Sequence, residues 1–212
     1  IPKDEILNEV KWGNSDLMRV GDWSIAIGNP LGLGGTVTAG IISAISREIG
    51  YGPYVKFLQT DASINRGNSG GPLFNINGEV IGINTAIISQ TGGSIGLGFS
   101  IPSNNALKIV NQLKEFGRTK RGWLGVQITP VSKEIAESLG LPDNKGAFIS
   151  NINPEGPSKI AGIQEGDVIL RFNNIEIVKM TDLPRVVAQS DIGSVALVEL
   201  WRKNRLIEIN VK

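Results

Sequence analysis

Glycine and proline interrupt this chain so often that long helices have little room to form. The 212 residues contain 27 Gly and 10 Pro, and the segments between them are short and rich in β-branched residues. Such punctuation is typical of strands joined by turns. We therefore predict a mainly β fold that contains few helices.

The first part of the chain divides into a series of predicted strands. Turn signals separate them, and Asn77-Gly78 predicts a β-hairpin. After residue 102 the apolar residues take helical spacing, which predicts a helix with Ser103 as its N-cap and Gly117 as its end. The predicted strands are 23–28, 36–46, 57–60, 72–74, 80–85 and 98–101.

A polar stretch at 118–122 is the best linker candidate, because it lies between the end of a helix and a new series of strands. We predict one domain over 1–117 and a smaller one over 123–212. Strands around two helices in the second part suit a small, partly open barrel. Its predicted elements are strands 124–128, 147–152, 167–172, 195–201 and 206–211, and helices 132–139 and 181–189.

Composition excludes several classes of function. Lys+Arg 21 against Asp+Glu 20 gives a net charge of +1, so electrostatics give no reason to expect nucleic acid or an anionic membrane as a partner. The chain contains no cysteine and no histidine. It therefore has no disulfides, no thiolate or imidazole metal ligands and no histidine base. We expect no metal site.

The start of the chain, IPKDEILNEVKWG, is mixed and charged and has no initiator Met. It lacks the pattern of a signal peptide, and we expect the natural beginning of the protein to lie outside these residues. The apolar runs are far shorter than the roughly 20 residues that cross a bilayer, so we predict no membrane span.

The segment Gly67-Asn68-Ser69-Gly70-Gly71-Pro72 is the most informative motif. A nucleophilic serine needs a tight turn that projects its hydroxyl, and glycines permit that turn. The same turn can aim the amides of Gly67 and Ser69 at one point, as an oxyanion hole does. The alternative is a plain glycine-rich hairpin corner. Asp61 is interpreted as a structural residue near this turn.

Several segments resemble one known family. TDASINRGNSGGPL (60–73), NGEVIGINTAI (77–87), GFSIPS (98–103) and residues 21–47 are similar to the HtrA/Deg family of chymotrypsin-like serine proteases. RGWLGV (121–126) and GPSKIAGIQEGDVI (156–169) resemble the PDZ domain of that family. The resemblance implies the C-terminal part of a chymotrypsin-like β-barrel protease domain, followed by a PDZ domain.

The resemblance implies roles for individual residues. Ser69 would be the nucleophile, and the amides of Gly67, Asn68 and Ser69 would form the oxyanion hole. Ile64 and Ile87 would line a pocket for a small apolar side chain of the substrate; the alternative is that both belong to the barrel core.

The chain also departs from the family pattern. The family uses a histidine base and an aspartate that orients it, and both belong to a first barrel half upstream of Ile1. None of Asp4, Asp16 or Asp22 lies in the family's acidic motif. We therefore expect this chain to be inactive alone, and we expect an incomplete barrel whose sheet edges are uncovered.

The second part suits a peptide-binding groove. Backbone amides in a glycine-flanked turn can bind a terminal carboxylate, and the edge of the following strand can pair with an extended peptide. An apolar wall on the last helix would select the final side chain; the alternative is that these residues only fill the core. Arg121 could attract the carboxylate or merely belong to the linker. The predicted peptide-binding residues are Gly122, Trp123, Leu124, Gly125, Val126, Leu183, Val186 and Val187.

The function that the resemblance implies is ATP-independent proteolysis of unfolded or mislocalised proteins in the bacterial periplasm. This function requires no cofactor, and the family implies trimer-based homo-oligomers of the full-length protein. The expected ligands of the PDZ domain are peptides with apolar C-termini. The alternative is a non-enzymatic peptide-binding protein or pseudoprotease.

Overall fold

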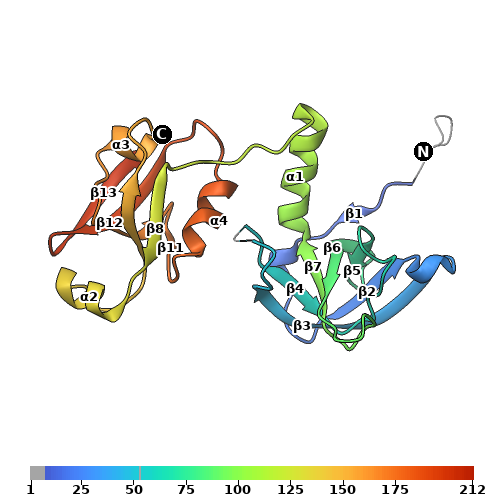
Figure 1. Ribbon diagram of the computed structural model, residues 1–212. Helices are drawn as coiled ribbons and strands as arrows, with labels where there is room; N and C mark the ends of the chain where they lie inside the picture. The colour runs from blue at the N-terminus through green and yellow to red at the C-terminus, as the bar shows by residue number, and fades with distance from the viewer. Residues whose placement is uncertain (1–7, 53) are drawn as a thin grey trace. The chain divides into compact units, whose positions relative to one another are not determined.

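The computed structural model describes residues 8–52 and 54–212 (Figure 1). Packing divides the chain into two compact units, with the main division between Thr119 and Lys120. That position lies inside the predicted linker 118–122. Both units are built mainly from β-strands, which confirms the predicted fold class. Along the described residues, no helix is both long and apolar enough to cross a membrane.

The first unit contains all six of the predicted strands and the predicted helix, together with short elements that were not expected. Its elements are β1 (Lys11–Trp12), η1 (Ser15–Leu17), β2 (Trp23–Gly28), η2 (Pro30–Gly32), β3 (Thr36–Arg47), β4 (Phe57–Thr60), β5 (Pro72–Phe74), β6 (Glu79–Ile87), β7 (Gly98–Pro102) and α1 (Ser103–Phe116).

Six of these strands close on themselves. The order is β6-β5-β2-β3-β4-β7, and β7 pairs again with β6 (Figure 1). Closure is possible because β6 is long enough to pair with β5 on one edge, at Leu73↔Gly82, and with β7 on the other, at Ile87↔Gly98. The expectation of an incomplete barrel with uncovered edges is therefore wrong, since a closed barrel has no free strand edge.

The ends of helix α1 are set by two different residues. Gly117 ends the helix in the left-handed conformation (φ 67), as predicted. The N-cap is Pro102 rather than the predicted Ser103. The Ser103 hydroxyl instead donates to the Gly13 carbonyl (2.7 Å) and accepts from the Ser15 amide (3.2 Å), so it fastens the helix to the segment before β2.

The second unit is an antiparallel sheet with three short helices. The strand order is β13-β12-β10-β9-β8, and β11 pairs with β10. Strand β8 is therefore an edge strand. The elements are β8 (Val126–Pro130), α2 (Lys133–Leu139), β9 (Ala147–Ile152), α3 (Pro157–Ala161), β10 (Val168–Phe172), β11 (Ile175–Glu176), α4 (Asp182–Gln189), β12 (Ala196–Arg202) and β13 (Arg205–Val211).

Two apolar clusters stabilise this sheet. The larger one joins α4 to the strands, and its fully buried members include Ile149, Ile169 and Val198. A smaller cluster lies under α2, where the Trp201 indole N–H donates to the Leu139 carbonyl at 2.8 Å. The hairpin β12–β13 turns at Lys203 and Asn204, both with positive φ (48° and 59°), which is typical of a type I′ turn.

Candidate active site and peptide-binding loop

Ser69 lies on the loop that leads from β4 into β5, and a network of backbone hydrogen bonds fixes its shape. The Asn29 amide donates to the Gly67 carbonyl at 3.1 Å, and the Gly71 amide donates to the Asn68 carbonyl at 2.9 Å. Gly67 has φ +105, and a Cβ there would collide with the Asn29 carbonyl. Glycine is therefore required at this position, because the backbone has positive φ and because Asn29, which directly follows β2, lies too close to leave room for a Cβ.

Two amides of this turn are available to a ligand. Among the described residues, the N–H groups of Gly67 and Ser69 have no hydrogen-bond partner. The Asn68 amide is different, because it donates to the Asn65 carbonyl at 3.0 Å. The middle amide is thus already used within the turn, and of the three amides expected to form the oxyanion hole only those of Gly67 and Ser69 are free; the hole itself stays a prediction.

The side chains of the turn differ sharply in exposure. Ser69 is exposed, and its hydroxyl donates to the Thr85 carbonyl at 3.2 Å. Asn68 is 1% exposed, and neither atom of its side-chain amide has a partner among the described residues. The turn therefore exposes its serine and buries the unsatisfied side-chain amide of the residue before it.

The other residues singled out near this turn lie in or against the barrel core. Ile64 is 1% exposed and packs with Ile42 and Leu58, whereas Ile87 is half-buried against the same cluster. Only Ile87 thus has surface to offer a substrate, and the pocket role of the two residues stays a prediction. The Asp61 carboxylate accepts from the Ile41 amide at 2.7 Å, consistent with its interpretation as structural.

No histidine base accompanies Ser69 in this chain. The 212 residues contain no histidine. Among the described residues, no group of three acidic side chains is placed to hold a metal ion. The arrangement provides an exposed hydroxyl and two free amides, which can stabilise an oxyanion but cannot remove the serine proton.

In the second unit, the loop before β8 is fixed through its carbonyls. The Leu124 carbonyl accepts from both the amide and the hydroxyl of Ser158, which is fully buried, and the Gly125 carbonyl accepts from the Asn153 amide at 2.9 Å. The amides of residues 122–125 have no partner among the described residues. Successive free amides of this kind form a site for an anion such as a carboxylate.

The strand that follows this loop is open to pairing. Strand β8 pairs only with β9, so its second edge is free. Val126 and Ile128 are half-buried, and Gln127 between them is exposed. A free edge next to an anion-binding loop is the geometry that binds an extended peptide by its C-terminus.

Helix α4 contributes less surface than expected. Leu183, Val186 and Val187 are 2%, 3% and 7% exposed and belong to the core cluster. Of the three, Val187 alone also lines a pocket beside the loop. Their buried positions favour the alternative that they fill the core, and their contribution to selectivity stays a prediction.

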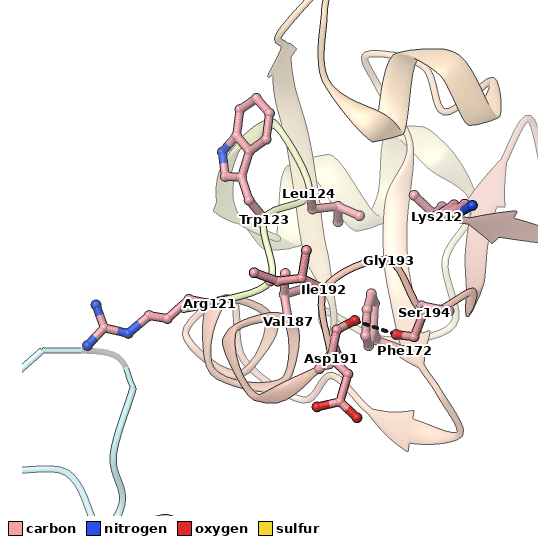
Figure 2. A pocket seen from close by; sticks show the side chains of 14 residues that line it. Arg121, Trp123, Leu124, Phe172, Val187, Asp191, Ile192, Gly193, Ser194 and Lys212 are labelled. Carbon is pink, nitrogen blue, oxygen red and sulfur yellow. Dashed lines mark hydrogen bonds between the residues drawn. The ribbon is translucent and has the colours of Figure 1, made fainter. Parts of the chain in front are cut away.

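The pocket beside the loop has a volume of about 350 Å³. Figure 2 shows Leu124, Val187 and Ile192 gathered at it, whereas the Arg121 guanidinium points away. The residues after α4 that line this pocket could not be singled out from the sequence, because a short polar loop has no hydrophobic periodicity. The lining residues are Arg121, Gly122, Trp123, Leu124, Phe172, Val187, Ser190, Asp191, Ile192, Gly193, Ser194, Ala196, Val211 and Lys212.

Comparison with known proteins agrees with this geometry. Residues 4–83 match the model of the trypsin-like peptidase domain, and residues 122–212 match that of the PDZ domain. A probable periplasmic serine endoprotease, DegP-like, of Brucella suis is 54% identical over 202 residues, which cover 95% of this chain but only 39% of that protein. The chain thus spans about two fifths of this relative.

Solved structures give the same result. The HtrA-type protease AlgW with a tripeptide has a TM-score of 0.81 at 42% identity, covering 96% of this chain and 68% of that one. The serine endoprotease from Yersinia pestis has a TM-score of 0.63 at 36% identity, covering 96% and 65%. With an exposed serine beside two free amides on a closed barrel, followed by a PDZ domain, this chain belongs to the HtrA family of serine proteases.

Proposed function

We propose that this chain is the serine-bearing part of an endoprotease that cleaves unfolded proteins by acyl-enzyme chemistry. The observation that carries the proposal is the pair of unpartnered amides at Gly67 and Ser69 beside the exposed Ser69 hydroxyl. Donors placed in this way stabilise the oxyanion of acyl transfer, and each one typically contributes about 3–4 kcal/mol to lowering the barrier.

In this mechanism the Ser69 Oγ bonds to the scissile carbonyl carbon while its proton passes to a histidine. The carbonyl electron pair moves onto oxygen, where the two amides stabilise it. The tetrahedral intermediate then expels the amine, which takes the proton from the histidine, and water hydrolyses the acyl-enzyme by the same steps. Because the 212 residues contain no histidine, the base is supplied by polypeptide outside them, and the chain alone is not competent.

The test compares this chain with a two-barrel chain, defined as these 212 residues preceded by a first barrel of the family that carries the histidine and aspartate. A fluorophosphonate probe should label the two-barrel chain at Ser69, and Ser69→Ala should abolish labelling and peptide hydrolysis. Ser63→Ala, which removes another exposed serine of the same loop, should change neither. Hydrolysis that survives Ser69→Ala would overturn the proposal.

We further propose that the second unit binds peptides through a free, apolar C-terminus. The support is the unpartnered amides of residues 122–125 next to the free edge of β8. Fluorescence anisotropy should detect binding of a peptide ending in a free carboxylate, and amidation of that carboxylate should abolish it. Equal affinity for both peptides would exclude carboxylate capture by this loop.

A loop variant tests the same proposal from the side of the protein. In Gly122→Ala the new Cβ would collide with the Val187 carbonyl, so the loop must shift and peptide affinity should fall. Gly166→Ala has open space around its Cβ but a positive φ (+89), so it is a control that should lower stability without touching the loop. It should leave affinity unchanged.

We also propose a location and an assembly for the full-length protein. DegP-like relatives are named periplasmic, and we propose the same compartment for this protein, where ATP-independent quality control is required. Trimer-based assembly is proposed for the full-length protein from the family alone, and light scattering tests it. If the two-barrel chain has no hydrolytic activity but binds peptides, the alternative of a pseudoprotease that serves as a binding module replaces the catalytic proposal.

A further inference from the structure

Asn84 on strand β6 contacts the nucleophile turn through its backbone. Its amide donates to the Gly71 carbonyl at 2.9 Å, and its carbonyl accepts from the Gly70 amide at 2.8 Å. Gly70 and Gly71 directly follow Ser69. The strand that supports the turn is thus joined to it within two residues of the nucleophile.

The side chain of Asn84 extends this contact and is itself buried, at 1% exposed. Its Nδ2 donates to the Pro72 carbonyl at 3.1 Å. Its Oδ1 accepts from the Ser100 hydroxyl on β7 at 2.9 Å. One residue therefore binds three consecutive residues after Ser69 and connects them to the strand that closes the barrel.

The next residue completes the arrangement. Thr85 accepts the hydrogen bond from the Ser69 hydroxyl, and the pairing of β6 with β7 shifts register between Asn84 and Ala86. Such bulges redirect groups near active sites. Asn84 and Thr85 of β6 therefore hold both the backbone that follows Ser69 and the Ser69 hydroxyl.

We infer that Asn84 is a positioning residue for the proposed nucleophile, an inference that rests on the proposed function of Ser69. It sets the orientation of the Ser69 Oγ and of the Ser69 amide in the oxyanion hole. An amide side chain is needed because a donor and an acceptor are used at once in a site without water access. Misplacing reacting groups by about 1 Å can slow a reaction on the order of 100-fold.

The experiment measures kcat and KM of the two-barrel chain with a peptide substrate. Asn84→Asp keeps the shape of the side chain and an acceptor for Ser100, but places an oxygen against the Pro72 carbonyl. We expect kcat to fall roughly 10- to 100-fold while KM stays within about twofold, because the substrate-binding surface is unchanged. A residue that only stabilised the barrel would lower the folded fraction without lowering kcat per folded molecule.

Asn75 supplies the matched control within the same barrel. Its Nδ2 donates to the Glu79 carboxylate at 2.8 Å, and its Oδ1 accepts from the amides of Asn77 and Glu79. It is thus as extensively hydrogen-bonded as Asn84, but in the β5–β6 hairpin loop. Asn75→Asp should affect stability and leave kcat within about twofold.

The outcomes are distinct. A normal kcat per active site in Asn84→Asp, with sites titrated by the fluorophosphonate probe, would overturn the inference while loss of activity in Ser69→Ala still supports the proposed function. An equal fall of kcat in Asn75→Asp would also overturn it. If Asn84→Asp does not fold, Asn84→Ser is measured instead, with the same expected fall in kcat and the same criterion.

Discussion

The Ser69 hydroxyl is joined to the Thr85 carbonyl by a hydrogen bond of 3.2 Å. The hydroxyl proton is therefore held by a neutral backbone acceptor rather than by a base, and the oxygen is no better a nucleophile than an ordinary alcohol. This geometry supports the proposal that Ser69 is not activated within this chain alone.

Ser69 should react slowly in this chain alone. A fluorophosphonate should label this chain alone on the order of 100- to 10,000-fold more slowly than the two-barrel chain, which is the usual contribution of a general base. Mass spectrometry of the labelled peptide measures both rates. Equal rates would mean that the hydroxyl is activated by a group within these 212 residues.

Gly67→Ala should damage the turn. The residue has φ +105 and its Cβ would meet the Asn29 carbonyl, so strain of roughly 1–3 kcal/mol is expected in the barrel, together with displacement of the Gly67 amide from its proposed place in the oxyanion hole. Urea unfolding and kcat of the two-barrel chain measure the two effects. Gly78→Ala, also at positive φ but with open space around its Cβ, should lower stability and leave kcat unchanged.

The pair Asp167–Arg202 should dominate the polar stability of the second unit. Arg202 Nε and Nη2 contact the two carboxylate oxygens at 2.7 Å each, and this hydrogen bonding raises the pKa of Arg202. Because Asp167 is 1% exposed, Asp167→Ala should reduce the unfolding free energy by about 3–5 kcal/mol. Glu176→Gln, which breaks the exposed pair with Lys145, should cause no measurable change in chemical denaturation.

Asp22 should make the first unit less stable in acid. The Arg19 amide donates to its carboxylate at 2.8 Å, and the Arg19 guanidinium approaches at 3.2 Å; both lower the pKa of Asp22 below its usual 3.8. Because the pKa of Asp22 is lower in the folded than in the unfolded protein, its carboxylate stabilises the fold at pH values above 3.8. This stabilisation is lost as the pH falls through the pKa of the folded state. In an NMR titration, Arg19→Ala should retain part of the shift, because the backbone amide is its largest cause. Complete loss would contradict this assignment.

Trp123 should report peptide binding. It is 61% exposed within the loop with free amides, so a bound peptide should exclude water from the indole and shift its emission to shorter wavelength. Trp123→Phe should remove the shift while anisotropy still detects binding. A shift that persists in Trp123→Phe would place the peptide near another tryptophan.

Local patterns predicted the elements of this fold well. Runs of β-branched residues bounded by Gly and Pro gave the strands, and the positive φ of Lys203 and Asn204 places a turn between the predicted strands 195–201 and 206–211. Asn77-Gly78 also marked a hairpin, but the loop is longer than two residues, because Asn75 accepts from the Asn77 and Glu79 amides and closes a four-residue turn.

What the sequence could not predict depends on contacts between distant residues. The pairing of Ile83 with Ile101 closes the barrel, and nothing in either segment alone specifies its partner. The motif placed Ser69 correctly on a turn, but which amides stay free depends on Asn65, whose carbonyl binds the Asn68 amide. Ile64 is apolar both in a pocket and in a core, so only its packing distinguishes the two.

Because β7 pairs with β6, the hydrogen-bonded ring of the serine-bearing barrel is complete without strands from another domain. A domain whose hydrogen-bonded ring is complete can be expressed separately from a barrel that supplies a histidine. Under the proposed function, this chain is therefore a candidate for split-enzyme complementation, in which cleavage reports that two tethered proteins have met.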